Sequence, residues 1–190
     1  MTRRRRARPH PFLPGDKIVL RPLQASDLTG AYLDWLNDYE VTRFLETGKK
    51  PATLASLRRY VEAMTQAPDT VMLAITEKRS GVHVGNVKLG GIHPVHRRAD
   101  LGIMLGDKRR WGRGYGREAV ALILAYGFDR LNLNKIYLGV DAENSAAVRV
   151  YEQLGFKIEG TLRQHLFRDG AYRDQHVMSV LREDYGGLGR

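Results

Sequence analysis

Trp111-Gly112-Arg113-Gly114-Tyr115-Gly116-Arg117 lies just past the middle of this 190-residue chain. Three glycines alternate with larger residues, and a helical pattern of apolar residues begins directly after them. Glycine lets backbone amides approach an anion closely, and the N-terminus of a helix adds a favourable dipole. A flexible turn at the start of a helix is the alternative. The pattern predicts a phosphate or pyrophosphate site that uses Gly112, Arg113, Gly114, Tyr115, Gly116 and Arg117.

Two common phosphate motifs do not match this segment. No Lys-Ser or Lys-Thr pair follows the glycines, which excludes the loop that binds nucleoside triphosphates. The spacing of the glycines also differs from the fingerprint of dinucleotide-binding proteins. The segment therefore predicts an anion site outside these two classes.

Periodic apolar residues predict the elements around the glycines. Apolar residues recur at helical steps from Val120 to Leu131, which indicates a helix that ends before Asn132. Strands are indicated before and after it by Ala99–Leu105 and Lys135–Val140. Further strands are expected at 17–23, 71–76, 82–89, 156–159 and 176–181. Further helices are expected at 26–36, within 38–45, at 53–64 and at 145–154. Ser26-Asp27 is the expected N-cap of the first of these helices, and Thr53 is the expected N-cap of the third. This order predicts a mixed α/β (α+β) fold with a mostly antiparallel sheet of about six to seven strands and helices on both faces.

A second constellation is Asn144-Ser-Ala-Ala-Val-Arg-Val-Tyr151-Glu-Gln-Leu-Gly155-Phe156. Asn144 stands at the junction of a strand and a helix, and Tyr151 follows two helical turns later on the same face. A helix cap and a half-buried aromatic residue are the structural explanations. The shared face also allows both side chains to contact one ligand.

The two constellations, separated by one helix and one strand, resemble the two hallmark motifs of the GNAT superfamily of N-acetyltransferases. Gly114 and Gly116 stand at the glycine positions of Arg/Gln-x-x-Gly-x-Gly/Ala, and Trp111 replaces the usual Arg or Gln. The resemblance covers about Val71 to Leu181 and includes the branch that acetylates ribosomal-protein N-termini, spermidine and nucleotide-linked amino sugars. It implies the GNAT fold, with acetyl-CoA as co-substrate.

The resemblance also implies roles for particular residues. In GNAT enzymes the asparagine contacts the cofactor and the tyrosine hydroxyl lies near the thioester sulfur, which implies that Asn144 binds acetyl-CoA and that Tyr151 is the general acid. A backbone amide in the Met104–Leu105 stretch is expected to stabilise the carbonyl oxygen. Asp100 is the expected general base, because related enzymes often carry a carboxylate at a similar point; a solvated carboxylate at a strand edge is the alternative.

His93 and His96 offer another route for the proton of the amine. Their spacing lacks a third ligand or a carboxylate nearby, so we expect no metal. The chain has no cysteine, which excludes disulfides and thiolate metal sites.

The sequence leaves the acceptor amine open. Segments at 95–100, 132–135 and 170–174 resemble bacterial spermidine N-acetyltransferases, whereas 38–45 resembles enzymes that act on nucleotide-linked amino sugars; a protein N-terminus is a third candidate. An acetyl-CoA-binding sensor or nucleic-acid-associated module without turnover is the alternative function. Carboxylates in the first helices fit a cationic amine or form only a solvated face; they are Asp27, Asp34, Asp38, Glu40 and Glu46, with Arg43 as the single base.

The net charge of +10 owes much to five arginines between Arg3 and Arg8. A flexible solvated arm at 1–14 is favoured over a contact with nucleic acid, the ribosome or a membrane surface. No apolar core follows these arginines, so they do not form a secretory signal, and no apolar run is long enough to cross a membrane. We expect a cytoplasmic enzyme with a single domain at 15–185 and a tail at 186–190; a homodimer is expected only by analogy with relatives.

Overall fold

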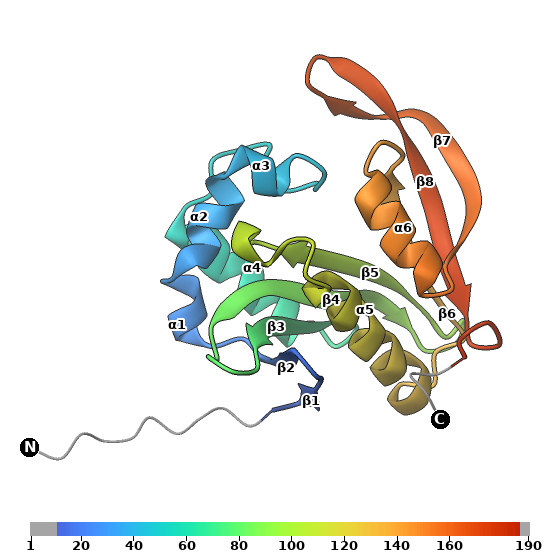
Figure 1. The fold of residues 1–190 in the computed structure, drawn as a ribbon, viewed down its shortest axis with the longest axis horizontal. Helices are drawn as coiled ribbons and strands as arrows, with labels where there is room; N and C mark the ends of the chain where they lie inside the picture. Colours follow the sequence, from blue (N-terminus) through green and yellow to red (C-terminus); the bar gives the residue numbers. More distant parts are fainter. Residues whose placement is uncertain (1–10, 187–190) are drawn as a thin grey trace, which may run out of the picture.

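A computed structural model describes residues 11–186, in which one sheet carries helices on both of its faces (Figure 1). The arginines of the expected arm and the last residues of the expected tail, 187–190, lie outside this range. Part of the expected arm belongs to the sheet, because Leu13–Pro14 pairs with Ile18–Pro22. Between residues 11 and 186, no helix is long and apolar enough to cross a membrane.

Eight strands form the sheet, in the order β1-β2-β3-β4-β5-β6-β8-β7. Their bounds are β1 Leu13–Pro14, β2 Ile18–Pro22, β3 Val71–Glu77, β4 His83–His93, β5 Arg98–Leu105, β6 Lys135–Asp141, β7 Lys157–Arg168 and β8 Ala171–Leu181. All neighbouring pairs are antiparallel except β5 and β6, which are parallel. The predicted mixed, mostly antiparallel sheet is confirmed, and β1 is the strand that the apolar pattern did not indicate.

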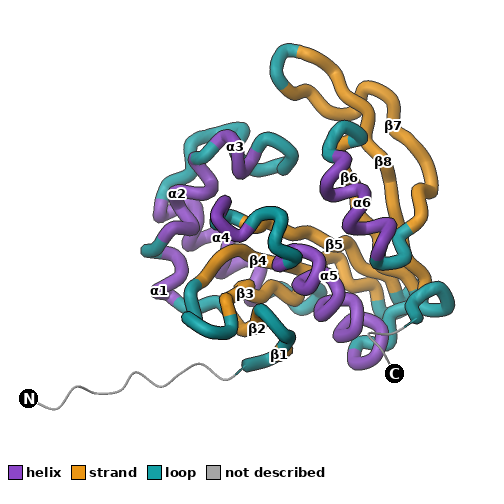
Figure 2. Tube along the Cα trace, viewed as in Figure 1, coloured by secondary structure: helices purple, strands orange, loops and turns teal. Residues whose placement is uncertain are grey.

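Helices cover the two faces as predicted (Figure 2). On one face, α5 and α6 pack over a core that contains Leu101 and Ile136. On the other face, α2 and α4 pack around Trp35, Leu57 and Met72. The helical elements are α1 Ala25–Leu28, α2 Ala31–Asn37, α3 Tyr39–Thr42, α4 Leu54–Gln66, the 3-10 turn η1 Lys108–Arg110, α5 Tyr115–Ala125, the π-helical turn η2 Tyr126–Arg130 and α6 Ser145–Gln153.

Side chains of β5 alternate between the two faces, as in any strand. Ala99 and Leu101 belong to the core under α5, and Met104 packs against the core under α2 and α4. Asp100, which lies between Ala99 and Leu101, is therefore on the α2 and α4 side. This strand borders the candidate site, so the alternation decides which residues can reach it from each side.

The first helix differs from the prediction at both ends. Gln24 is the N-cap in place of Ser26 or Asp27, and the Asp27 carboxylate accepts a hydrogen bond from the Gln24 backbone N–H at 2.7 Å. The helix ends after four residues, and Gly30 then starts α2 in an extended conformation. Arg21 of β2 donates hydrogen bonds of 2.7 and 2.8 Å to the same carboxylate. Apolar spacing alone does not indicate this break, because part of what fixes it comes from another element.

The last two strands are longer than the predicted segments 156–159 and 176–181. β7 and β8 form a hairpin whose turn, Asp169-Gly170, has φ of 52° and 76°. An aspartate-glycine pair with two positive φ angles is typical of a two-residue type I′ turn. Figure 1 shows that the hairpin projects beyond the rest of the sheet, on the side where α3 lies across from it.

Candidate active site

β5 and β6 are paired only over their first residues. The parallel pairing runs from Arg98 and Lys135 to Asp100 and Tyr137 and then stops. Because β5 continues for five residues beyond Asp100 and β6 for four beyond Tyr137, the two strands separate. We call this opening the fork. Backbone groups at such an unpaired edge need other partners, which makes the fork suitable for a ligand.

The open edge of β5 presents backbone groups to the fork. In an antiparallel pair, alternate residues direct their N–H and C=O groups toward the partner strand or away from it. The Gly106 N–H donates to the Val84 carbonyl of β4 at 2.9 Å, so by alternation Met104 also faces β4 and Leu105 faces the fork. The Leu105 carbonyl accepts a hydrogen bond from Trp111 Nε1 at 2.7 Å. Within the predicted Met104–Leu105 stretch, Leu105 is the residue whose amide can bind an oxygen in the fork.

The glycine segment forms an exposed loop at the N-terminus of α5. φ is 68° at Gly112 and 82° at Gly114, a region that side chains of L residues disfavour. A Cβ atom at Gly112 would have no neighbour within 4 Å, so the loop is open on this side. Arg113 and Arg117 are exposed, and neither has an ion-pair partner in the described part of the chain. Free cations, exposed amides and a helix N-terminus together fit a phosphate or pyrophosphate.

Two side chains hold this loop against the sheet. Lys17 Nζ donates a hydrogen bond to the Arg113 carbonyl at 3.0 Å. The Tyr115 hydroxyl donates to Glu77 at 2.7 Å, and Gly116 follows within the first turn of α5. Tyr115 therefore anchors the loop, and direct contacts of Tyr115 and Gly116 with a cofactor stay predictions.

Tyr151 lies on the side of α6 that faces the sheet. The side chain is buried, with its ring 5.5 Å from the Phe156 ring between centroids. Its hydroxyl makes no hydrogen bond to residues 11–186 and is not enclosed by them. Burial raises the pKa of Tyr151 to about 12, so the hydroxyl keeps its proton at neutral pH. It is a free hydrogen-bond donor within an apolar surrounding.

Helix geometry relates Tyr151 to the fork. α6 starts just beyond the end of β6 and is the helix over the same face as α5. Seven residues of α-helix rise about 10 Å, so Tyr151 lies back from Asn144 toward the level at which β5 and β6 separate. Asn144 accepts a hydrogen bond from the Ala147 N–H at 3.3 Å and is the N-cap of α6. A contact between Asn144 and a cofactor stays a prediction.

Asp100 is the last residue of β5 that pairs with β6, and it lies where the fork begins. Its side chain is half-buried and accepts no hydrogen bond from any described residue. Burial raises the pKa of this carboxyl, and the Lys88 ammonium opposes the shift. Asp100 is on the α2 and α4 side, whereas Tyr151 belongs to the core under α5. The two side chains therefore approach the fork from opposite faces of the sheet.

Three of the five carboxylates expected near an acceptor already have cationic partners. Asp27 is buried against Arg21 at 2.7 Å. Asp38 and Glu40 each lie 2.8 Å from the Lys108 ammonium. Two cations, Arg21 and Lys108, thus offset part of the acidic character that the sequence indicates for the first helices.

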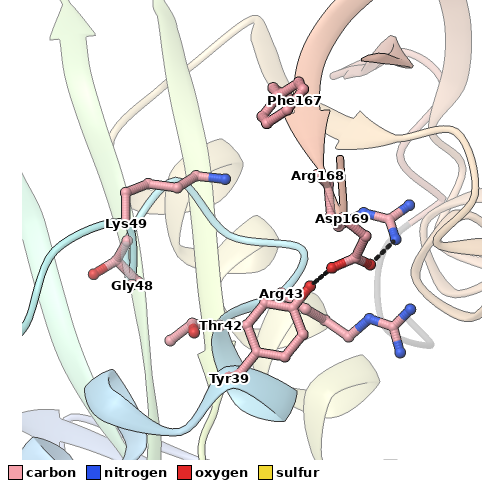
Figure 3. Close-up of a pocket in the computed structure, with 9 residues that line it drawn as sticks. Tyr39, Thr42, Arg43, Gly48, Lys49, Phe167, Arg168 and Asp169 are labelled. Carbon is pink, nitrogen blue, oxygen red and sulfur yellow. Dashed lines mark hydrogen bonds and ion pairs between the residues drawn. The ribbon is translucent and has the colours of Figure 1, made fainter. Parts of the chain in front are cut away.

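A cavity of about 170 Å³ lies between the α3 region and the tip of the β7–β8 hairpin (Figure 3). Across it, the Tyr39 hydroxyl donates a hydrogen bond to Asp169. Arg168 connects the hairpin to the end of β6, since its Nε donates to Asp141 Oδ2 at 3.0 Å. The cavity therefore lies beside the open end of the fork.

The segment 38–45 and Arg43 entered the prediction about the acceptor, whereas the lining residues of the hairpin and Lys49 were not predicted for the site. The residues that line this cavity include Tyr39, Arg43, Lys49, Phe167, Arg168 and Asp169. The one signal that could have indicated the hairpin is the Asp169-Gly170 pair between strand-like segments. No local signal indicates that this turn meets α3.

His93 and His96 lie at the turn between β4 and β5, beyond the paired end of the fork. Their rings stack with centroids 4.2 Å apart, and the His96 backbone N–H donates to His93 Nδ1 at 3.1 Å. Across residues 11–186, no three His, Asp or Glu side chains gather in a way that could hold a metal ion. A proton relay through these histidines stays a prediction.

Comparison with known proteins finds a family model that covers most of the chain. The model described as Acetyltransferase (GNAT) domain matches residues 17–157. The chain is 28% identical over 174 residues to the uncharacterized N-acetyltransferase YoaA of Bacillus subtilis. This match covers 90% of this chain and 97% of that protein. It is 40% identical over 105 residues to the spermidine N(1)-acetyltransferase of Escherichia coli K12, a match of 55% of this chain and 56% of that protein.

Solved structures show the same fold. The spermidine N-acetyltransferase from Vibrio cholerae, in complex with CoA and spermine, superimposes with a TM-score of 0.81 at 28% sequence identity. The superposition covers 90% of this chain and 99% of that chain.

Proposed function

The chain belongs to the GNAT acetyltransferase family and is an acetyl-CoA-dependent N-acetyltransferase, and from this premise we propose that it acetylates a primary amine by direct attack within the fork. The amine belongs to a small molecule, such as a polyamine or a nucleotide-linked amino sugar, or to a protein N-terminus. The observation that carries the proposal is the unpaired stretch of β5 and β6 between the glycine loop and the free hydroxyl of Tyr151. A homodimer and a cytoplasmic location stay predictions.

Acetyl-CoA supplies the acetyl group as a thioester, and the loop residues Gly112 to Arg117 would hold its pyrophosphate. The Leu105 amide would donate a hydrogen bond to the acetyl carbonyl oxygen, where negative charge develops. The Tyr151 hydroxyl would give its proton to the sulfur as the thiolate leaves. An unperturbed amine has a pKa of about 10, so Asp100, directly or through water, would accept the proton that the amine must lose.

Gly114→Ala is expected to raise the Kd of acetyl-CoA severalfold. A Cβ at φ of 82° is strained by about 1–2 kcal/mol, and relief of that strain would move the amides that face the phosphates. Calorimetric titration with acetyl-CoA measures the change. Gly81→Ala is the matched control, because Gly81 has φ of 71° and no neighbour near its Cβ, yet lies in the β3–β4 turn. Equal Kd values for the two variants would contradict the loop as the phosphate site.

A turnover assay tests the proposed function itself. CoA release from acetyl-CoA is measured with spermidine, a nucleotide-linked amino sugar and N-terminal peptides as acceptors, and acetylation at nitrogen is verified by mass spectrometry. We expect at least one amine to be acetylated. Binding of acetyl-CoA without turnover of any amine would instead support a sensor.

A further inference from the structure

The cavity between α3 and the hairpin has a positive lining. Arg43, Lys49 and Arg168 contribute three cations, but Arg168 is already paired with Asp141, Glu143 and Asp169, so Arg43 and Lys49 are the lining cations left for a ligand. Asp169 is occupied, because it accepts hydrogen bonds from Tyr39 and, at 3.3 Å, from Arg168. The single lining carboxylate is therefore already engaged by Tyr39 and Arg168.

Arg43 and Lys49 are available to a ligand. The Arg43 guanidinium lies 4.7 Å from the centre of the Phe44 ring, and Arg168 lies at the same distance from that ring. Stacking of this kind holds a guanidinium in place and leaves the donors at its edge free. Both Arg43 and Lys49 are exposed and have no ion-pair partner in the part of the chain that the structure describes. Figure 3 shows both side chains around the same cavity as Phe167.

The positive surface continues into an adjoining cavity of about 230 Å³. This second cavity shares Tyr39 and Lys49 with the first and adds Lys50, and no carboxylate lines it. The exposed acids Asp34 and Glu46 line neither cavity. An anion placed near Lys49 would therefore meet Lys49 and Lys50, and no carboxylate that lines this second cavity.

We propose that the acceptor is an elongated amine that also carries an anionic group, a phosphate or a carboxylate, which binds at Lys49. This rests on the proposed function, because it takes the fork as the place of acetyl transfer. The cavity lies beside the end of β6, and Tyr151 lies about 10 Å from Asn144 along α6, so an acceptor that reaches from the cavity into the fork must be elongated. The exposed rings of Tyr39 and Phe167 add surfaces on which a planar group can stack.

Competing acceptors in one assay test this proposal. The probes are a UDP-linked amino sugar for the phosphate source, a hexapeptide with acidic residues after its free N-terminus for the carboxylate source, and spermidine as the cationic amine. We expect one of the two anionic amines to exceed spermidine in kcat/KM. Added salt is expected to lower kcat/KM for that anionic amine, because it screens the attraction between the charges. The preferred anionic probe identifies the source of the charge.

Lys49→Glu tests whether Lys49 binds the anionic group of the acceptor. It is expected to lower kcat/KM for the preferred anionic amine by about tenfold or more and to raise it for spermidine. Arg59→Glu is the matched control: it makes the same change in net charge at an exposed position on α4 that lines neither cavity. This control is expected to leave kcat/KM within about twofold.

The outcomes separate this proposal from the proposed function. Preference for spermidine, with no loss of kcat/KM for the anionic amines in Lys49→Glu, overturns the anionic acceptor and leaves the acetyltransferase intact. If no amine is turned over, the proposed function fails. Calorimetry with the UDP-linked sugar and the acidic peptide on the CoA-saturated protein then tests whether the anion site exists. If either probe binds to the wild-type protein and not to Lys49→Glu, the anion site is supported. If neither probe binds to the wild-type protein, the anion site is overturned.

Discussion

Tyr151→Phe is expected to lower kcat by about 10²- to 10⁴-fold, the range in which a positioned general acid contributes. The leaving group is a thiolate, and a thiol such as that of cysteine has an ordinary pKa of about 8.5. Burial raises the pKa of Tyr151 to about 12, so the hydroxyl is protonated over the whole neutral range and can act as the donor. Steady-state kinetics at saturating acetyl-CoA, with the best acceptor of the panel, measures the effect.

The variant separates chemistry from folding. The Tyr151 hydroxyl has no hydrogen-bond partner among residues 11–186, so its removal leaves no group unpaired and the Tm should stay near that of the wild type. Tyr126→Phe is the matched control, because Tyr126 packs against the same core and its ring lies 5.2 Å from Phe12. A kcat for Tyr151→Phe within about threefold of this control would show that the hydroxyl is not the general acid.

The elements that carry the candidate site were predictable because neighbours in the sequence decide them. Thr53 caps α4 as expected, with its hydroxyl accepting the Ser56 N–H at 3.1 Å. Asn144 caps α6, and Gly155 with φ of 89° follows its end. Capping and apolar periodicity act over a few residues, so a single sequence contains the whole signal.

The fork was not predictable in this way. Asp100 and Tyr137 are 37 positions apart, and the strand pattern of β5 and β6 continues without interruption past the point where their pairing stops. Apolar alternation indicates that a segment is a strand, but it does not indicate how far that strand is paired. The position of Asp100 at the start of the opening emerges only from the folded sheet.

Charges gave the least reliable indication of the acceptor. The acids of the first helices are visible in the sequence, but their partner Lys108 is about 70 residues away and reaches both Asp38 and Glu40. Lys49 attracts no notice in the sequence, because what distinguishes it is a cavity shared with the distant hairpin. Electrostatic arguments about a binding site thus need the partners of each charge, which only tertiary structure provides.

Asp100→Asn is expected to lower kcat/KM for the amine by about 10²- to 10⁴-fold near pH 7, because the amide cannot accept the proton. Burial raises the pKa of Asp100, so the wild-type kcat/KM should rise with pH along a limb that lies above the ordinary carboxyl range. In Asp100→Asn this limb disappears, and only the rise caused by deprotonation of the amine itself is left. Profiles of kcat/KM against pH measure both effects.

Lys88→Met is the matched variant that keeps the carboxylate and changes its environment. The Lys88 ammonium lowers the pKa of Asp100, so its loss raises that pKa further and moves the limb to higher pH. The amine in solution is unchanged, so its own limb stays in place and the two contributions can be told apart. A limb that persists in Asp100→Asn and does not move in Lys88→Met would assign the proton to another acceptor, such as water or His93. A limb that moves in one variant and vanishes in the other can only belong to Asp100.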